Sequence, residues 1–365
     1  MNHRERVLMA LNHKTPDRCP MQISFTPEFA KRLSKKMKIQ GEDSHNPHGG
    51  GNTYKLELAL DEDMLLTSIG WANSYYQDGF KNGNGEEYVD EWGIRWKVIQ
   101  YDTKYGKGRY TEIIGHPLAN DDIVNTYLVP DPNRQELYRE AQKLIDNYKI
   151  DYFIVGVTVT TIFETAWALR GMEKLLMDFI INPGLAEEIL NIPYHYHLTA
   201  AKKLTEMGVD MIWIGDDVGT QKAMMFSPQI WRNFFKPKMA NFISEIKKIN
   251  PTLKVAYHSD GVIYPIIPDL IEIGVDVLNP IQPAAMDPYK LKKEYGDKLC
   301  FWGTLDEQYT LPFGSPGEVR KEVLSRINLL GKQGGLIIGP THNIQLDTPM
   351  NNFWVMVNTI RKTYY

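Results

Sequence analysis

Cysteine is scarce in this chain. Its 365 residues include two cysteines, Cys19 and Cys300, which lie far apart and form no Cys-x-x-Cys pair. Because zinc modules built on cysteine need clustered thiols, that class of protein is excluded. Low cysteine usage is typical of a reducing compartment, and the charged, helix-forming start of the chain does not resemble a signal peptide. We therefore expect a cytoplasmic location.

An excess of positive charge and a long apolar run are also missing. Lysine and arginine together number 41, against 45 aspartates and glutamates, which gives a net charge of −4. Nucleic acids and anionic lipids are bound mainly through basic surfaces, so we expect neither as a partner. The longest apolar stretch, residues 152–162, is too short and too rich in threonine to span a bilayer. With 43% hydrophobic residues, the composition is that of a globular protein with an ample core.

A glycine-rich phosphate loop is absent too, because no Gly-x-Gly-x-x-Gly follows the first predicted strand. This disfavours a doubly wound, nucleotide-binding sheet, which is the alternative to the fold that we predict. From residue 131 onward, short apolar segments alternate with helical ones, the pattern of a parallel sheet covered by helices. Strands are predicted to begin near Met21, Leu65, Phe153, Met211, Val255, Val275, Leu299 and Leu336. Eight strands that alternate with helices predict one α/β domain over residues 1–365, a (β/α)8 TIM barrel.

Residues 64–118 have a different residue pattern. Aromatic and β-branched residues alternate there with glycine turns, as in Glu91-Trp-Gly-Ile-Arg-Trp96. No linker encloses the region. We therefore predict a β-rich antiparallel hairpin insertion in the N-terminal third of the barrel, and not a second domain.

Polar residues follow most of the predicted strands. In a TIM barrel the carboxyl ends of all strands face one mouth, where catalytic residues are found. Helical periodicity does not explain such a concentration of polar residues, so we predict a functional site there. We assign a catalytic role, as general base or as a further metal ligand, to Glu164, Asp216 and Asp217. Substrate-binding roles are predicted for Gln22, Asn279, Gln282, Asp306 and Gln308.

His258, Asp260 and His342 are the strongest candidates for a metal site. Two imidazole nitrogens and one carboxylate form a three-ligand set that leaves a zinc position open for water or substrate. The His-x-Asp spacing lets one turn supply two ligands, and the last strand can supply the third. The alternative is that both histidines only form hydrogen bonds within the mouth and that Asp260 caps the next helix.

Several longer segments are recognisable as family motifs. They are residues Phe163–Gly171, Gly215–Gly219, His258–Gly261, Gly274–Pro283, Gly303–Gln308 and Gly334–Ile344. In their order and spacing they resemble the uroporphyrinogen decarboxylase superfamily, and the resemblance covers most of the chain. It implies a (β/α)8 barrel with one of two activities. One branch decarboxylates uroporphyrinogen without a cofactor; the other moves methyl groups between corrinoid cofactors and acceptors such as thiols, with zinc held by a His-x-Cys pair and a later Cys.

The sequence is closer to the corrinoid-dependent methyltransferase branch, with one departure. His258 matches the zinc-binding histidine, Asp260 stands where the first cysteine is expected, and His342 lies near the position of the second. Harder ligands thus replace both thiolates, which suits an oxygen-bearing substrate. The resemblance implies a metal-dependent methyltransferase for a small-molecule methyl donor or acceptor. Its cofactors would be zinc or another divalent metal and a corrinoid, supplied by a partner protein.

Two other functions remain open. A decarboxylase of porphyrinogens would need cationic anchors for its carboxylates, but the strand ends offer mainly Asp, His and Gln. The decarboxylase motif Arg-Gln-Ala-Gly-Arg-Tyr is also missing, since the corresponding residues 20–27 read Pro-Met-Gln-Ile-Ser-Phe-Thr-Pro. The other possibility is a non-catalytic barrel that binds a ligand or a corrinoid protein.

Overall fold

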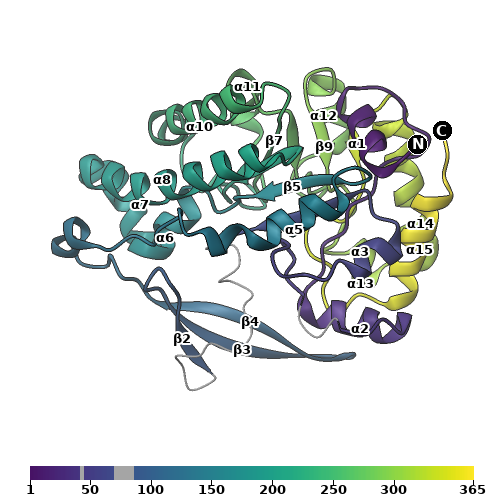
Figure 1. The fold of residues 1–365 in the computed structure, drawn as a ribbon, viewed down its shortest axis with the longest axis horizontal. Helices are drawn as coiled ribbons and strands as arrows, with labels where there is room; N and C mark the ends of the chain where they lie inside the picture. The colour runs from purple at the N-terminus through teal and green to yellow at the C-terminus, as the bar shows by residue number, and fades with distance from the viewer. Residues whose placement is uncertain (42–44, 70–85) are drawn as a thin grey trace.

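A curled parallel sheet forms the centre of the molecule (Figure 1). The computed structural model describes residues 1–41, 45–69 and 86–365. Seven strands follow one another around the sheet in chain order: β1 (Met64–Ser68), β5 (Phe153–Val157), β6 (Met211–Gly215), β7 (Lys254–His258), β8 (Val277–Asn279), β9 (Cys300–Trp302) and β10 (Leu336–Ile337). Their side chains are buried on both faces, because one face fills the barrel interior and the other packs against helices.

The first predicted strand fills the gap between β10 and β1. Met21 forms a parallel bridge with Ile338, just beyond β10. On the other side, the backbone N–H of Asp63 donates to the carbonyl of Met21 at 2.9 Å. We call residues 21–25 the seam segment, because it joins the two edges of the sheet. The predicted TIM-barrel fold is therefore confirmed, although the seam segment is held by single bridges instead of a regular ladder.

Helices cover the outside of this wall (Figure 1). Gly208 and Gly274, with φ of +98° and +95°, end α8 and α11 in the left-handed conformation that glycine favours. Within the described ranges, no helix combines the length and the apolar character that a membrane span requires. The α-helices are α1 (His3–Leu11), α2 (Pro27–Met37), α3 (Lys55–Leu60), α5 (Arg139–Tyr148), α6 (Phe163–Arg170), α7 (Met172–Ile181), α8 (Pro183–Met207), α9 (Pro228–Ile230), α10 (Lys236–Ile249), α11 (Ile267–Glu272), α12 (Pro288–Tyr295), α13 (Thr310–Phe313), α14 (Pro316–Arg326) and α15 (Met350–Lys362).

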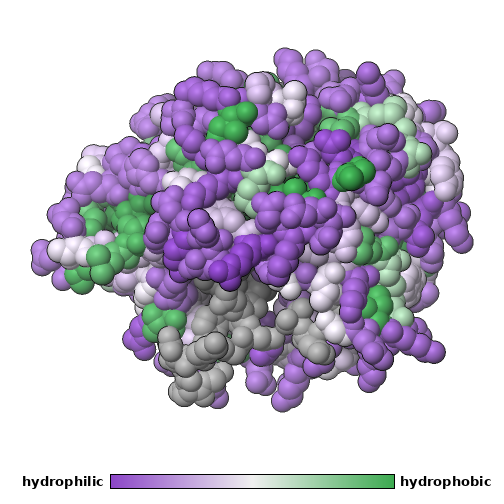
Figure 2. Space-filling model, viewed as in Figure 1, coloured by the Kyte–Doolittle hydropathy of each residue, from purple (hydrophilic) through white to green (hydrophobic). Residues whose placement is uncertain are grey.

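The face of the molecule in Figure 2 is mostly hydrophilic. Hydrophobic residues gather near its left edge, around α7, where Ile180 and Ile181 are exposed at the end of the helix. Apolar side chains exposed at the end of a helix are common on protein surfaces. Most large apolar side chains of the described residues are instead buried in the barrel interior or between the wall and its helices.

Aspartates tie neighbouring strands together at their amino ends. Asp210 precedes β6, and its Oδ2 accepts the backbone N–H of Ile154 in β5 at 3.0 Å. Asp276 precedes β8 and accepts the N–H of Val255 in β7 at 2.9 Å. Asp63 precedes β1 and does the same for the seam segment at 2.7 Å. Each carboxylate thus satisfies a backbone donor at the start of a strand, where the ladder itself offers no acceptor.

Asp63 also binds two buried guanidinium groups. Its side chain is fully buried, and Arg6 and Arg18 each donate an Nη1–H to it at 2.7 Å. His3 donates from Nδ1 at 2.9 Å. Burial alone would raise the pKa of Asp63, but the hydrogen bond from His3 and the charges of Arg18 and Arg6 outweigh it and lower the pKa. The seam is therefore anchored by a carboxylate that stays ionised.

A three-stranded antiparallel sheet is inserted after β1, as predicted. It consists of β2 (Glu87–Val89), β3 (Arg95–Thr103) and β4 (Gly106–Gly115). We call residues 87–115 the arm. The predicted insertion began near residue 64, but β1 belongs to the barrel; residues 70–85 of that prediction lie outside the described residues. β1 (Met-Leu-Leu-Thr-Ser) is as strand-like as the hairpin, and no linker in the sequence separates the two, which is why the pattern did not distinguish them.

The arm runs along the carboxyl end of the barrel. At its tip, the hydroxyl of Tyr101 donates to Gln345, beyond β10, at 3.4 Å. Just after its base, Nδ1 of His116 donates to the carbonyl of Ala168, in α6, at 2.7 Å. Figure 1 shows the arm passing beneath the barrel from α6 toward α2. It therefore lies beside the mouth, where the predicted site residues are.

The first prediction concerns the seam. Asp63→Asn should lower the free energy of unfolding by about 3–5 kcal/mol, because it leaves two buried guanidinium groups beside a neutral amide. The matched control is Asp61→Asn, since Asp61 is 40% exposed and reaches Arg18 from the solvent side; its cost should be about 0–1 kcal/mol. Urea unfolding measures both variants, and equal midpoints would show that the seam does not depend on Asp63.

The same pair of variants has a pH signature. Because the pKa of Asp63 is lower in the folded state, this residue contributes fully to the free energy of unfolding at pH values above its pKa in the unfolded chain. This contribution is then lost as the pH falls through the folded-state value. The stability difference between wild type and Asp63→Asn should therefore shrink in acid, while that of Asp61→Asn stays small throughout.

Candidate metal centre

The carboxyl ends of β6 and β7 bring two acidic turns together. Gly215 at the end of β6 pairs in register with His258 at the end of β7. The residues that follow, Asp216-Asp217 and Ser259-Asp260, therefore leave the sheet side by side. A Cβ at Gly215, whose φ is +124°, would lie 2.2 Å from the carbonyl oxygen of His258. The close approach of the two turns thus requires glycine here.

Further along, the same turns pack backbone against backbone. A Cβ at Gly219 would lie 2.6 Å from the carbonyl oxygen of Asp260, and one at Gly261 would lie 2.5 Å from that of Thr220. The buried hydroxyl of Ser259 accepts a backbone N–H from the β6 turn at 3.1 Å and donates to the carbonyl of Asp260 at 3.0 Å. Both turns are consequently held at a fixed separation.

Asp217, His258 and Asp260 meet at this place, and we call them the triad. One ligand atom from each lies within 4.8 Å of the other two, the spacing that a single metal ion requires. Nε2 of His258 is 3.5 Å from Oδ1 of Asp217, which also accepts the backbone N–H of Asp260 at 2.7 Å. Oδ1 of Asp260 is buried and has no hydrogen-bond partner in the described part of the chain. An oxygen atom left in this state is suited to bind a cation.

Asn279 fixes the tautomer of His258. Its Nδ2 donates to the carbonyl of Trp302 at 3.1 Å, and a carbonyl can only accept, so the amide orientation is determined. Oδ1 of Asn279 must then accept from Nδ1–H of His258, at 2.8 Å. The lone pair of the neutral imidazole is therefore on Nε2, which faces the triad. Metal-binding histidines are commonly oriented in this way.

Two tryptophans pack beside the histidine. The rings of Trp213 and His258 meet nearly perpendicular with centroids 5.4 Å apart, and Trp213 lies 4.5 Å from Trp302. Nε1 of Trp302 donates to Oε1 of Gln22, on the seam segment, at 3.0 Å. The triad thus borders an apolar layer, in which charge interactions are stronger than in water.

The two remaining acids of the predicted catalytic group support the turns. Oδ1 of Asp216 accepts the backbone N–H groups of Ile162 and Glu164, both at 3.0 Å, and so caps the start of α6. Burial raises the pKa of Asp216 to about 6. Glu164 accepts the backbone N–H of Asp217 at 3.1 Å. Burial, followed by the charges of Asp217 and Asp216, raises the pKa of Glu164 well above its usual value.

The electrostatics of the triad favour a cation. Burial raises the pKa of Asp260, and the charge of Asp217 adds to this effect, while His342 and His258 oppose it. The ionised form of a carboxyl group in such surroundings is unfavourable without a positive charge nearby. One imidazole and two carboxylates are a ligand set found at divalent metal sites, and three protein ligands leave a position open. The residues present therefore fit the predicted metal.

His342 lies outside the triad. Its side chain is exposed, and Asp217 takes the third place in the cluster of ligand atoms. His342 is nevertheless close enough for its charge to act on Asp260. The structure thus brings together two of the three predicted ligands with one residue from the predicted catalytic group. The role of His342 as a ligand stays a prediction.

The predicted substrate-binding residues have structural partners. Gln282 accepts the backbone N–H of Gly261 at 2.7 Å, and Asp306 accepts that of Gln308 at 2.9 Å. The side chain of Gln308 is exposed. The side chains of Gln282, Asp306, Asn279 and Gln22 thus hold the loops of the mouth in place. Their contact with a substrate stays a prediction.

Sequence reasoning missed Trp213 and Glu307. Trp213 was hidden in an apolar strand, where only the alternation of side chains between the two faces of the wall could have placed it beside His258. Glu307 lies in the turn after β9, next to the predicted Asp306. Burial, and then the charges of Asp347, Asp260 and Asp306, raise the pKa of Glu307 to about 8. The mouth therefore carries another carboxyl group that is protonated at neutral pH.

Comparisons with known proteins agree with this architecture. The sequence model of the family described as uroporphyrinogen decarboxylase (URO-D) matches residues 98–363. No protein of curated function matches the chain. Among solved structures, a methyltransferase from Methanosarcina mazei is 18% identical, with 99% of this chain and 99% of its own chain covered and a TM-score of 0.67. A B12-independent methionine synthase from a Shewanella species is 12% identical, with 73% and 72% covered and a TM-score of 0.37. The methyltransferase therefore shares its fold with this chain over the full length. The TM-score of the methionine synthase is too low to support an argument.

The second prediction concerns the orientation of His258. Asn279→Ala should weaken the binding of Zn²⁺ by about 10–100-fold, because it removes the acceptor that keeps the proton on Nδ1. Asn279→Asp should restore tight binding, since a carboxylate accepts the same hydrogen bond. Competition with a chromophoric chelator measures the affinities, and Gln308→Ala, on the exposed rim, is the control. The assignment is wrong if Asn279→Ala binds as tightly as wild type while His258→Ala does not.

Proposed function

The chain belongs to the uroporphyrinogen decarboxylase family, and from this membership and its site we propose that it is a metal-dependent methyltransferase. The reaction would exchange a methyl group between a small methylated molecule and a corrinoid that a partner protein carries. The triad is the observation that carries the proposal. The fold, shared over its full length with a methyltransferase from Methanosarcina mazei, is consistent with it. A cofactor-free decarboxylase would have no use for an oriented imidazole between two carboxylates.

Asp217, His258 and Asp260 would hold the metal, and His342, whose charge acts on Asp260, would be a further ligand. When bound, zinc would act as a Lewis acid that polarises an oxygen or nitrogen atom of the substrate. Because the described ligand atoms include nitrogen and carboxylate oxygen but no sulfur, they favour hard ligands over activation of a thiol. An oxygen-bearing methyl donor or acceptor fits this chemistry best.

The surrounding residues would position the triad. Asn279 holds the proton on Nδ1 of His258, so that Nε2 is available. Glu164 accepts the backbone N–H of Asp217, and Asp216 is occupied by two backbone donors of α6. We therefore propose positioning roles for Glu164 and Asp216, in place of the general-base role that the sequence predicted. The apolar ring of Trp213 would exclude water from one side of the site.

Decarboxylation of a porphyrinogen is less well supported. Asp217 and Asp260 lie at the mouth, where burial and nearby charges, including that of Asp260, raise the pKa values of Glu164 and Glu307. The negative charge that Asp217 and Asp260 bring to the mouth repels a substrate that carries many carboxylates. A barrel that binds its ligand without turnover would keep the triad, so only an activity measurement separates that function from the first.

The third prediction tests the proposal. Protein stripped with a chelator and reloaded should hold one equivalent of zinc and should demethylate methylcobalamin, or methylate cob(I)alamin, in the presence of the right substrate. His258→Ala should lower both zinc content and rate by at least about 100-fold, because it removes the only nitrogen ligand of the triad. The matched control is His195→Ala, on the exposed face of α8, which should leave both unchanged. Absorbance of the corrinoid measures the rate.

Other results would favour the other functions. Less than about a tenth of an equivalent of any transition metal after zinc loading would exclude the metal-dependent reaction. Turnover of uroporphyrinogen that His258→Ala does not affect would assign the decarboxylase function. The protein could also bind zinc stably but transfer no methyl group to or from a panel of methoxy, methylamine and methylthio compounds. That result would favour the function of a non-catalytic, ligand-binding barrel.

A further inference from the structure

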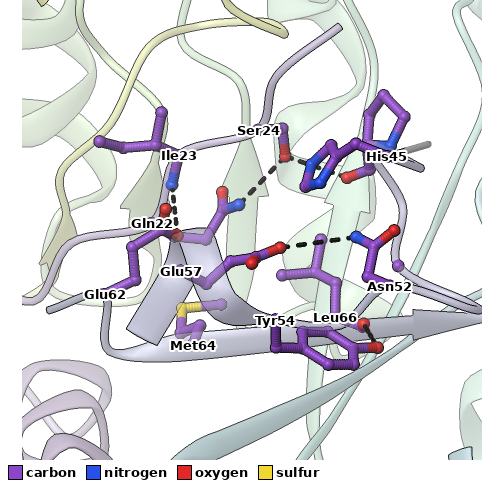
Figure 3. A pocket seen from close by; sticks show the side chains of 12 residues that line it. Gln22, Ile23, Ser24, His45, Asn52, Tyr54, Glu57, Glu62, Met64 and Leu66 are labelled. Carbon is purple, nitrogen blue, oxygen red and sulfur yellow. Dashed lines mark hydrogen bonds between the residues drawn. The ribbon is translucent and has the colours of Figure 1, made fainter. Parts of the chain in front are cut away.

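A small cavity lies where the seam segment separates from β1 (Figure 3). The two strands are joined at Met21, but beyond this residue the ladder stops. The backbone N–H of Ile23 donates to Oε2 of Glu62 at 3.0 Å, and the carbonyl of Leu66 accepts from the hydroxyl of Tyr54 at 2.7 Å. Side chains thus replace strand-to-strand hydrogen bonds, and a gap in the barrel wall remains between them.

Two buried carboxylates point into this gap. Glu57 comes from α3 and is 7% exposed, and Glu62 precedes β1 and is fully buried. Figure 3 shows both side chains on either side of Gln22. Among the described residues that line the cavity, none is a lysine or an arginine. Two ionised carboxylates in one cavity repel each other, and this repulsion is costly inside a protein.

Glu62 is not satisfied by the protein groups around it. Its Oε2 accepts the N–H of Ile23, but its Oε1 is buried and has no partner in the described ranges. Burial, and then the charge of Glu57, raise the pKa of Glu62 well above its usual value. Without a cation the cavity therefore holds a protonated carboxyl group. A cation would remove both the unpartnered oxygen and the repulsion.

The size and lining of the cavity limit what can enter. The free space is close to that of a single water molecule. Besides the two carboxylates, Ser24 supplies an oxygen atom, and so does Gln22, whose Oε1 also accepts from Nε1 of Trp302. Asn52 instead turns its Nδ2 toward Oε1 of Glu57, at 3.5 Å. Mg²⁺ usually keeps several of its waters and would not fit, whereas Ca²⁺ accepts a flexible shell of protein oxygens. Na⁺ shares this hard-ligand chemistry.

We propose that the cavity is a binding site for one dehydrated hard cation, coordinated by Glu57 and Glu62, which closes the seam of the barrel. The site is distinct from the triad, which contains none of these residues. Two carboxylates match the charge of Ca²⁺; Na⁺ would require one of them to keep its proton. The cation links α3 to the strand edge and takes the place of the missing ladder.

The fourth prediction tests this site in the full-length protein. After removal of metals with a chelator, Ca²⁺ should bind with one equivalent at the seam and raise the midpoint of thermal unfolding by roughly 2–5 °C. Calorimetric titration and a melting curve measure the two effects. Replacing choline chloride by sodium chloride at equal ionic strength distinguishes the ions, because a Na⁺ site responds to this exchange and then gains little from Ca²⁺. Binding should tighten as the pH rises, since the cation displaces a proton.

The variants separate the seam from the triad. Glu62→Gln should weaken cation binding at least ten-fold while keeping the hydrogen bond from Ile23, and the metal-free variant should unfold no earlier than metal-free wild type, since an unpaired carboxyl is removed. Glu57→Gln is the second variant if that protein does not fold. Asp260→Asn should lose zinc at the triad but keep the response to Ca²⁺ or Na⁺. The proposal is wrong if neither ion shifts the midpoint or if both glutamine variants bind as wild type does; the cavity then holds water and a shared proton.

Discussion

The contact between Asp63 and the guanidinium groups of Arg6 and Arg18 holds the barrel closed. A parallel sheet of seven strands has two free edges, and the seam segment joins them with single bridges. Asp63 binds the backbone of this segment and also two arginines that precede the barrel wall. Because closure fixes the order and tilt of the strands, it also decides which turns meet at the opposite end. The triad therefore depends on a carboxylate at the far end of the wall.

Much of the fold could be predicted from the sequence. Every predicted strand position lies on the barrel wall, because short apolar strands alternate with amphipathic helices and because glycines such as Gly208 and Gly274 mark the helix ends. The boundary of the arm could not be predicted, since β1 and the hairpin both have strand-forming sequences and no linker separates them. Nor could the gap at the seam. Its cause is the replacement of ladder bonds by the side chains of Glu62 and Tyr54, which no local pattern encodes.

The site could be predicted only in part, for a similar reason. His258 and Asp260 share one turn, so their proximity follows from their spacing. Asp217 joins them because the glycines at 219 and 261 let two backbones touch, an arrangement that depends on residues far apart in the sequence. The exposed position of His342 and the support that Asn279 gives to His258 likewise depend on tertiary structure. Pattern reasoning found the mouth and most of its polar residues, but not which of them touch.

The arm suggests how such a protein can diversify. All three residues of the triad come from the end of β7 and the turns after β6 and β7, whereas the arm is inserted after β1 and is fastened to the wall near its tip and its base. The chemistry and the neighbouring surface are thus encoded in separate stretches of the gene. Mutations that lengthen, shorten or recharge the arm can alter which molecules approach the mouth without disturbing the ligands. Natural selection can therefore retune partner choice while the reactive centre is inherited unchanged.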